Sequence, residues 1–326
     1  MNTKTTSRIV LAGLLVLAVI FPLIAGPYPQ SIMKTVFVYM ALALAWDILL
    51  RSGQLSFGIA GFYGLGAYAS VLAVIHLKIG GVAAVVFGGL FAALIAYALG
   101  LIFLRLRGMY FAITTLALAE IFRIVIRNWK GFAGGPEGLI LPHVAFEGAA
   151  WPSYLLVLAV VLVVIGVSEL VEKGRFRFAL TAIRNNEIVA MSRGVNIYST
   201  LVKAFVVSSG LMGMAGAAYA QLYGFVTPDN SFSVDFTLLP LAMALLGGIY
   251  GTWGPVVGAL ALGVIAEYLK LFIPYGHLIV YGIIIILVIL FMPRGFVGLA
   301  RDLAARRRAG GTGAGNGSDS GEEVPA

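Results

Sequence analysis

The sequence predicts an all-α protein that crosses a membrane several times. Of its 326 residues, 60% are hydrophobic and only 11% are charged, and the mean hydropathy of +0.99 lies far above that of an average soluble domain. A helix needs about 20 apolar residues to span the hydrocarbon core of a bilayer, and runs of about that length follow one another along the chain. We therefore expect a polytopic membrane helix bundle of about ten spans (eight to ten), without disulfide bonds because cysteine is absent.

Ten apolar runs are candidate spans. They cover residues 9–26, 32–50, 54–76, 82–104, 108–128, 153–172, 204–224, 236–252, 255–273 and 277–292. The first run resembles a signal peptide because it follows Lys4 and Arg8, but IAGPYP is a poor cleavage site, so we expect a retained helix. The runs predict one transmembrane domain, residues 1–303. The tail, residues 304–326, is rich in glycine and charge and is expected to be disordered.

The positions of the 22 lysine and arginine residues predict the orientation. With the N-terminus inside, most of them fall on the cytoplasmic side, as the positive-inside rule requires. Those near or toward the other side are Lys34, Lys78, Arg123, Arg127, Lys130 and Lys270. Both termini and the loop of residues 173–203 are therefore expected in the cytoplasm, and the loop of residues 129–152 outside. The net charge of +8 does not indicate nucleic acid, because the basic residues do not share one face with interleaved aromatics.

Glycine is concentrated in two of the predicted spans. In the third span the glycines are Gly53, Gly58, Gly61, Gly64 and Gly66. The seventh span contains GLMGMAG. Such segments let helices approach closely and let a span bend or break, so residues 53–70 form either a tightly packed helix or a half-span that lines a cavity. Gly247 and Gly248 predict a tight turn before the ninth span.

The outer loop contains GFAGGPEG at residues 131–138. These are turn-forming residues that must lie outside the membrane. A phosphate-binding loop is excluded, because no Lys-Ser/Thr pair follows the glycines and the loop faces the wrong compartment for a nucleotide.

The cytoplasmic loop contains a predicted amphipathic helix, residues 178–193, that ends at Gly194. Its apolar stripe consists of Leu180, Ile183, Ala190 and Met191. Glu187 falls on the same stripe, where an unpaired carboxylate is costly, and Arg184, three residues earlier, is its expected local partner. The helix either lies on lipid headgroups or packs on its own bundle, or it docks on another protein.

Carboxylates inside spans are costly and mark structural pairs or functional sites. Three of them precede a basic residue by three or four positions: Asp47 with Arg51, Glu120 with Arg123, and Glu267 with Lys270. For the first and third we favour structural ion pairs. For Glu120 a structural pair and a polar patch at the outer mouth of a pathway stay equally open, and Arg127 extends the row toward the outer surface.

Neutral polar side chains in the spans either line a route or bond neighbouring helices. They are Gln54, Ser56, Thr114 and Thr115. We take these four, together with Glu120, as candidates for a substrate pathway. The histidines are too scattered for a metal site, and no Ser-His-Asp constellation or facing carboxylate pair supports a hydrolase. The sequence therefore predicts a protein that is not an enzyme and has no metal site.

Four sequence blocks cover nearly the whole chain outside the tail. They are SGQLSFGIAGFYGLGAYAS at 52–70, LRLRGMYFAITTLALAEIFRIVIRNWKGFAGGPEGL at 104–139, FALTAIRNNEIVAMSRGVNIYSTLVKAFVVSSGLMGMAGAAYA at 178–220 and LLGGIYGTWGPVVGA at 245–259. Together they resemble the LivM-type permease subunit of branched-chain amino acid ABC importers. The second block, which ends in GGPEGL, distinguishes this subunit type from its sister permease.

The resemblance implies a multi-pass permease subunit in the cytoplasmic membrane of a bacterium or archaeon. Residues 182–194 occupy the place of the EAA-like coupling helix, which inserts into a cleft of the ATPase. The coupling residues so implied are Arg184, Asn185, Asn186, Glu187, Ala190 and Gly194. The implied partners are two ABC ATPase subunits, a second, LivH-type permease subunit, an extracytoplasmic solute-binding protein and membrane lipid. The chain itself is expected to bind no cofactor, because it holds no GxxxxGK[ST], so ATP is used by the partner ATPase subunits.

Two departures from the family pattern bear on the solute. Ile59 stands where relatives often have His or Gln, and Asp47 with Arg51 stands where they usually have Asn and Gly. If these positions touch substrate, the solute is a related small polar molecule rather than a branched-chain amino acid.

Two other functions stay open. The alternative is an ion-coupled secondary carrier for amino acids, with Asp47, Glu120 or Glu267 as its coupling carboxylate, which does not need the cytoplasmic amphipathic helix. A non-transporting scaffold is the other, and it predicts no solute uptake.

Overall fold

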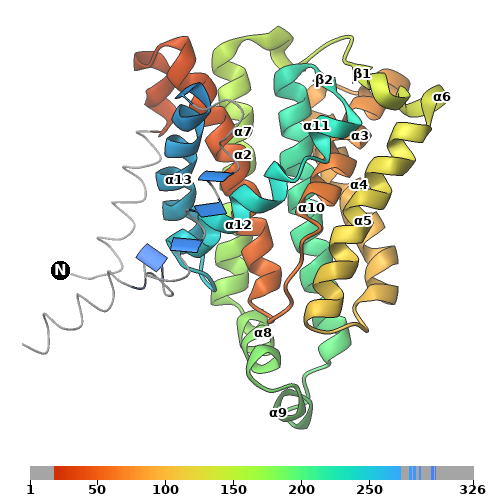
Figure 1. Cartoon of the computed structure of the whole chain (residues 1–326), viewed down its shortest axis with the longest axis vertical. Coiled ribbons are helices and arrows are strands. Elements are labelled where there is room, and N and C mark those ends of the chain that lie inside the picture. Colours follow the sequence, from red (N-terminus) through yellow and green to blue (C-terminus); the bar gives the residue numbers. More distant parts are fainter. Residues whose placement is uncertain are drawn as a thin grey trace, which may run out of the picture.

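The computed structural model describes residues 18–272 and short stretches between residues 279 and 298. The described chain is a bundle of helices with one very short two-stranded antiparallel sheet (Figure 1). The longer helices are α2 (Pro27–Leu50), α3 (Ile59–Leu77), α4 (Gly81–Phe103), α5 (Met109–Asn128), α7 (Ala150–Lys173), α8 (Arg175–Asn185), α10 (Ile197–Tyr223), α12 (Asp235–Gly247) and α13 (Trp253–Phe272). The short elements are α6 (Lys130–Ala133), η1 (Gly135–Glu137), β1 (Leu139–Ile140), η2 (Ala145–Gly148), α9 (Glu187–Ser192), β2 (Phe225–Val226) and α11 (Pro228–Ser231).

The described residues contain seven helical segments long and apolar enough to cross a membrane. These are α2, α3, α4, α5, α7, α10 and the combined α11–α12 segment. The prediction of an all-α polytopic membrane bundle is therefore confirmed at the level of about seven candidate spans. Half of the first predicted span (9–26), most of the tenth (277–292), both termini and the tail (304–326) lie outside the described residues.

Four predicted spans have bounds that differ from the structure by five residues or more, and one of them is the second, because α2 begins at Pro27 rather than at residue 32. The third was predicted to begin at residue 54, but α3 begins at Ile59, because residues 51–58 are not helical. The eighth was predicted to run to residue 252, but α12 ends at Gly247, and the next residue has a φ of +115° that favours glycine. The seventh span starts seven residues earlier than predicted, since α10 begins at Ile197, after Asn196, whose side chain accepts a hydrogen bond from the Ser199 N–H.

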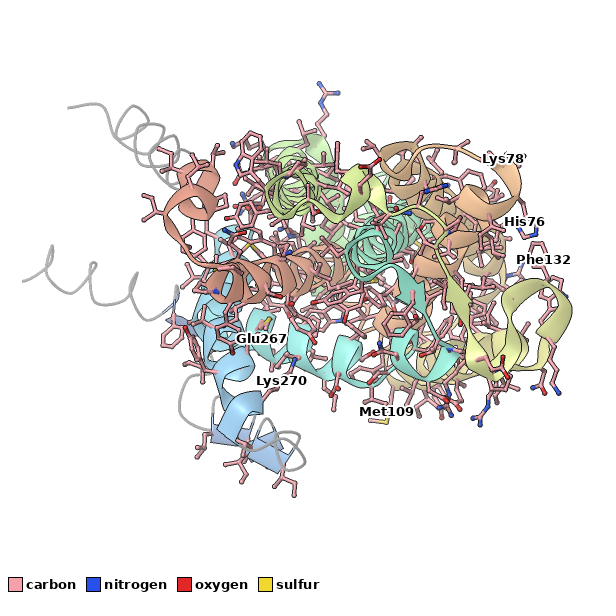
Figure 2. The ribbon with its side chains drawn as sticks, turned by 90° about the horizontal axis from the view of Figure 1, so that it is seen from above. His76, Lys78, Met109, Phe132, Glu267 and Lys270 are labelled. Carbon is pink, nitrogen blue, oxygen red and sulfur yellow. The ribbon has the colours of Figure 1, made fainter. Side chains whose placement is uncertain are left out.

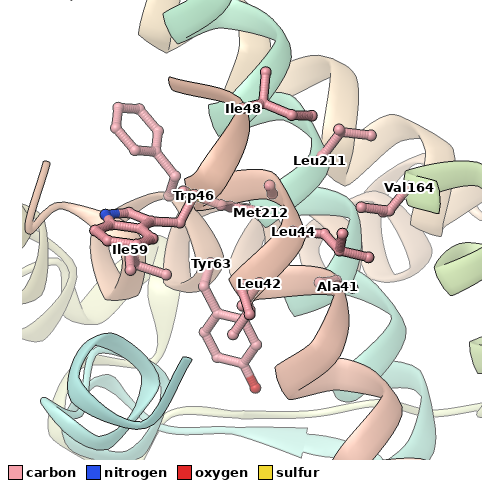
Figure 3. Close-up of a cluster of buried hydrophobic side chains, with 14 of the residues drawn as sticks. Ala41, Leu42, Leu44, Trp46, Ile48, Ile59, Tyr63, Val164, Leu211 and Met212 are labelled. Atoms are coloured by element: carbon pink, nitrogen blue, oxygen red, sulfur yellow. The ribbon is translucent and has the colours of Figure 1, made fainter. Parts of the chain in front are cut away.

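The core lies around α10 and α2. Helix α10 packs on α4, α3, α2 and α7, and α2 also packs on α12 and α13. Figure 3 shows part of this core, in which Trp46, Tyr63 and Met212 from α2, α3 and α10 are packed together. The close helix approach predicted from glycine is confirmed at Gly66, because an added Cβ there would lie 2.1 Å from the Gly213 carbonyl oxygen of α10.

The two loops predicted to face opposite compartments lie at opposite ends of the bundle (Figure 1). At one end are α6, β1 and β2, with β1 and β2 paired antiparallel so that Leu139 faces Val226. At the other end, α8 and α9 project beyond the spans. We call residues 175–192 the α8–α9 segment, and the end of the bundle that carries it the projecting end.

Candidate functional site

The α8–α9 segment is two helices, so the prediction of one helix over residues 178–193 is wrong. Helix α8 ends at Asn185, and Asn186 is extended with φ −162° and ψ 114°. The Asn186 side chain accepts hydrogen bonds from the N–H groups of Ile188 at 2.9 Å and Val189 at 3.2 Å. Asparagine is a favoured N-cap because its side chain satisfies N–H groups that lack a helical partner, so it starts α9 as a separate helix. The predicted stop at Gly194 is confirmed, with φ +79° directly after the C-cap of α9.

Glu187 and Arg184 do not pair with each other as predicted. The Glu187 carboxylate is half-exposed and forms an ion pair with Arg107, 3.0 Å from its Nε. Arg184 instead places its guanidinium 3.9 Å from the centroid of the Tyr250 ring, a cation–π contact. The break at Asn186 separates Arg184 and Glu187 onto different helices, so their i,i+3 spacing no longer applies.

The other predicted coupling residues divide between the core and the surface. Ala190 is fully buried, as are Leu180 and Ile183, so these stripe residues pack on the bundle. Asn185 is exposed, and an added Cβ at Gly194 would meet nothing within 4 Å. The remaining face of α9 is apolar and exposed: Ile188, Val189 and Met191 are 73%, 52% and 56% exposed. Met191, predicted on the buried stripe, therefore lies on the outer face.

Residues 51–58 form an irregular segment inside the bundle. Gln54 and Ser56 are buried there, with relative exposures of 4% and 3%. The segment and the first turn of α3 are held by side chains of three helices. The Ser56 carbonyl accepts from Trp46 at 2.8 Å, the Phe57 N–H donates to Thr115 at 3.0 Å, and the Ala60 N–H in α3 donates to Thr237 at 3.2 Å. Of the two structures predicted for residues 53–70, the tightly packed helix fits, because α3 is long enough to cross a membrane and is mostly buried. Residues 51–58 lead into it without helical structure. An irregular backbone at this depth is tolerated only where protein or a water-filled cavity surrounds it.

A groove of about 370 Å³ runs between α5 and α12, next to the irregular segment. Its lining residues are Phe57, Ala60, Ile113, Leu116, Ala117, Ala119, Glu120, Phe232, Val234 and Thr237. Of the predicted pathway residues, Glu120 lines this groove, and Thr115 accepts a hydrogen bond from the N–H of Phe57, another lining residue. Thr114 does not line it, and its hydroxyl donates to the Tyr110 carbonyl of its own helix at 2.8 Å. Gln54 and Ser56 do not line the groove, and the Gln54 Oε1 is buried without a partner among the described residues.

A row of charged side chains follows α5 away from the groove. Glu120 pairs with Arg123 at 2.5 Å, which was one of the two alternatives predicted for it. Arg123 and Arg127 also reach Asp229 of α11, at 3.2 and 3.5 Å. Every member is at least one-third exposed. Glu120 lies about 16 Å along a span that begins at Met109, close to the middle of a bilayer core. Charged groups at this depth face a bundle interior or water rather than lipid, so this face needs a cover.

The other two predicted ion pairs are confirmed. Arg51 Nε lies 2.9 Å from Asp47 Oδ2, and Lys270 Nζ lies 2.5 Å from Glu267 Oε1. Figure 2 shows Glu267 and Lys270 close together on the same helix. Neither Asp47 nor Arg51 lines the groove, and Ile59 is fully buried in the core, so the residues of both departures from the family pattern have structural partners. Within the described residues, no group of three His, Cys, Asp or Glu side chains is arranged to hold a metal ion.

Sequence reasoning missed the partners that join distant parts of the chain. Arg107, Tyr250 and Thr237 are examples, and so are Ser168 and Thr252, whose hydroxyls lie 2.8 Å apart. Their separations run from tens of residues to 203 residues for Asp47 and Tyr250. Helical spacing carries no signal at such separations, and only the fold brings these side chains together.

Known proteins similar to the chain agree with this description. Residues 28–289 match the family model described as branched-chain amino acid transport system / permease component. The high-affinity branched-chain amino acid transport system permease protein LivM of Escherichia coli strain K12 is 30% identical over 92% of this chain and 77% of that protein. A probable LivM permease of Methanocaldococcus jannaschii is 26% identical over 81% of this chain and 84% of its own length. A probable LivH permease of the same organism is 27% identical over 47% of this chain and 50% of its own length.

No solved structure matches the chain. The family model, however, covers most of the chain, including all seven candidate spans except the first residue of α2. The identity to a LivM protein is about 30% over nearly the whole length of this chain, and a membrane permease agrees with the multi-pass helix bundle. The chain therefore belongs to the branched-chain amino acid transport permease family, as a LivM-type, non-catalytic, multi-pass membrane component of an ABC transport system.

Proposed function

We propose that this chain forms one half of the membrane pore of an ATP-driven importer for branched-chain amino acids. In this proposal it pairs with a LivH-type permease subunit, receives solute from an extracytoplasmic binding protein and is driven by two ATPase subunits that bind at its cytoplasmic side. Movement of the ATPases switches the bundle between outward-open and inward-open arrangements. The chain binds no nucleotide itself.

The α8–α9 segment carries this proposal. It projects beyond the spans (Figure 1) and ends in an exposed apolar face made of Ile188, Val189 and Met191. Contact between water and such an apolar patch is unfavourable. Because the same helix buries Ala190 against the bundle, its outer face is free to enter a cleft of another protein. A helix laid in a groove by its apolar residues is a common mode of protein recognition, and an ATPase subunit is the proposed partner.

The groove between α5 and α12 supports the pairing with a second permease subunit. A LivH-type chain placed on this face would cover the charged row of Glu120, Arg123, Arg127 and Asp229, which is unfavourable toward lipid. The pathway would then run between the two subunits. The groove lining is mostly apolar with one carboxylate, which suits an aliphatic side chain beside a charged amino group.

The solute follows from the same geometry. Asp47, Arg51 and Ile59 are the positions that raised doubt about a branched-chain substrate, and they pair or pack away from the groove. They therefore give no reason to expect another small polar molecule in place of a branched-chain amino acid. The carboxylates named for an ion-coupled carrier are each ion-paired, so none of them is free to exchange an ion without breaking a pair.

The test is reconstitution in vesicles with the partner permease, the ATPases and the binding protein. We expect ATP-dependent uptake of labelled leucine, isoleucine and valine, and none when the ATPases are left out. Uptake that persists without ATPases would contradict the importer and favour an ion-coupled carrier. Absence of uptake with every component present would favour the scaffold.

Charge reversal at Glu187 tests the coupling role separately. Glu187→Lys breaks the ion pair with Arg107 and is expected to reduce solute-stimulated ATP hydrolysis. Glu187→Lys with Arg107→Glu restores the pair within the chain, but we expect it to stay defective because the ATPase still meets a reversed charge. Full recovery in the double variant would show that Glu187 serves only the fold.

A further inference from the structure

The projecting end of the bundle contains a buried polar cluster that the proposed coupling does not yet explain. Its centre is the ion pair of Asp47 and Arg51, whose side chains are only 0% and 5% exposed. Asp47 uses both carboxylate oxygens: Oδ2 accepts from Arg51 Nε at 2.9 Å and Oδ1 accepts from the Tyr250 N–H at 2.7 Å. Arg51 also donates to the Ser168 carbonyl at 3.1 Å and to the Ser168 hydroxyl at 2.7 Å. The pair therefore joins the end of α2 to α7 and to the turn between α12 and α13.

The cluster continues from Ser168 to the end of α7. The hydroxyls of Ser168 and Thr252 lie 2.8 Å apart. Thr252 donates twice to Glu172 Oε2, from its backbone N–H and from its hydroxyl, each at 2.9 Å. We call Asp47, Arg51, Ser168, Glu172 and Thr252 the polar cluster. Its members come from α2, α7 and the turn at residues 248–252, so three separate elements share one hydrogen-bonded network.

Tyr250 connects this cluster to the α8–α9 segment. It has φ +69°, a conformation that is rare for a bulky side chain and persists only where surrounding contacts hold it. Its N–H is bound by Asp47, and its ring lies under the Arg184 guanidinium of α8. Gly53 of the irregular segment also packs close to Arg184, since an added Cβ at Gly53 would lie 3.2 Å from Arg184 Cγ. Arg184 is thus held between the turn and the irregular segment.

We infer that the polar cluster, with the Arg184–Tyr250 contact, is the joint through which the α8–α9 segment moves the ends of α2, α7 and the α12–α13 turn as one unit. This inference rests on the proposed coupling role of the segment. A packed group whose donors and acceptors are satisfied does not deform gradually, so a displacement of α8 reaches all three elements together. Asp47, Arg51, Tyr250 and Thr252 are then positioning residues for transport, although none of them touches solute or ATPase.

The surface end of the joint allows a test in a folded protein. Removing one partner of a buried ion pair destabilises a protein strongly, so variants of Asp47 or Arg51 do not separate folding from coupling. Arg184 and Tyr250 are partly exposed, so Arg184→Gln and Tyr250→Leu are expected to fold. In the reconstituted importer we expect the solute taken up per ATP hydrolysed to fall about fivefold or more, the usual lower range of coupling between sites. Thermal stability is expected to stay unchanged in both variants, and basal ATP hydrolysis is expected to stay unchanged in Tyr250→Leu, which lies outside the coupling residues.

Matched controls separate this joint from general surface effects. Tyr250→Phe keeps the ring and is expected to behave as the wild type. Arg175→Gln removes an exposed arginine at the start of the same helix and is also expected to be silent. Wild-type uptake per ATP in Arg184→Gln and Tyr250→Leu would overturn the inference. A wild-type protein that shows no ATP-dependent uptake would instead overturn the proposed function.

A disulfide tests whether the parts move as one unit. The chain has no cysteine, and a Cβ built on Gly53 lies 3.5 Å from Arg184 Cβ, within the range of a disulfide. We expect Gly53→Cys with Arg184→Cys to be poorly coupled when reduced and to recover when oxidised, because the bond replaces the lost contact. Gly53→Cys alone controls for the strain of cysteine at φ +83°. Uptake that is blocked on oxidation would show that α8 slides past the irregular segment, which contradicts a rigid joint.

Discussion

Two glycine-to-alanine substitutions inside spans are expected to change stability in opposite directions. Gly66 of α3 faces α10, and an added Cβ would lie 2.1 Å from the Gly213 carbonyl oxygen and 2.4 Å from its Cα. Gly166 of α7 has nothing within 4 Å of an added Cβ. The same chemical change therefore meets backbone at one site and open space at the other.

The magnitudes follow from these distances. Both obstructing atoms at Gly66 belong to backbone, so no side chain can rotate away, and α3 and α10 must separate. Overpacking costs about 1–3 kcal/mol where side chains can yield, so we expect a loss of about 3 kcal/mol or more for Gly66→Ala. At Gly166 only the helix preference for alanine remains, which is worth about 0.5–1 kcal/mol in favour of the variant.

Thermal unfolding of the purified protein in detergent measures the difference. A gap of about 4 kcal/mol corresponds to a difference in Tm on the order of 10 °C between the two variants. A Gly66→Ala protein that is as stable as Gly166→Ala would refute the close packing of α3 on α10. The same result would remove the explanation given for the glycine content of the third span.

Two further predictions concern the groove. Thr115→Ala removes the acceptor of the part-buried Phe57 N–H and is expected to cost about 1–3 kcal/mol of unfolding free energy. Thr114→Ala is expected to be nearly neutral, because the Thr114 hydroxyl bonds only its own helix. Equal losses of unfolding free energy in a denaturation series would contradict this. Asp229→Asn removes the exposed ion pairs with Arg123 and Arg127, so the unfolding free energy of the isolated chain is expected to fall by at most about 1 kcal/mol. That loss should disappear at high salt, and a loss independent of salt would argue against a solvent-exposed row.

Local patterns were sufficient to predict much of the fold. The long apolar runs predicted most span positions to within a few residues. In the bilayer core no water is available, so the backbone groups of each apolar run must form their hydrogen bonds within a helix. The pairs of Asp47 with Arg51 and Glu267 with Lys270 were also predictable, since both lie within one helical turn of each other. Gly194 was predictable as a helix stop because its φ of +79° is accessible to glycine at little cost.

The errors came from competing local signals and from distant contacts. The apolar stripe continued through Asn186, so the periodicity favoured one helix, although an asparagine followed by an acidic residue is also a helix-start signal. The irregular segment at residues 51–58 was not predicted, because it is held by Trp46 and Thr115 of other helices. The partner of Glu187 is Arg107, which lies eighty residues earlier in the chain. Helical spacing gives no signal for a pair so far apart.

The groove required the fold as well. Phe57, Glu120 and Thr237 come from three separate segments, and their polar atoms gave no signal of a shared surface in the sequence. Glu120 could be proposed as a pathway residue because its cost inside a span was evident. Thr237 could have been noticed by the same argument, as a hydroxyl in an apolar span that needs a partner.

The central claim is that the outer face of α9 contacts an ATPase subunit, and site-directed crosslinking tests it most directly. Because the chain lacks cysteine, Ile188→Cys introduces a single thiol on the exposed face of α9, and Phe146→Cys places one at the opposite end of the bundle, where Phe146 is 48% exposed. With a short thiol-reactive photocrosslinker in membranes that contain the whole complex, Ile188→Cys is predicted to join this chain to the ATPase, and Phe146→Cys is not. A crosslink to the ATPase from Phe146→Cys, or none from Ile188→Cys in a complex that transports, would contradict the account.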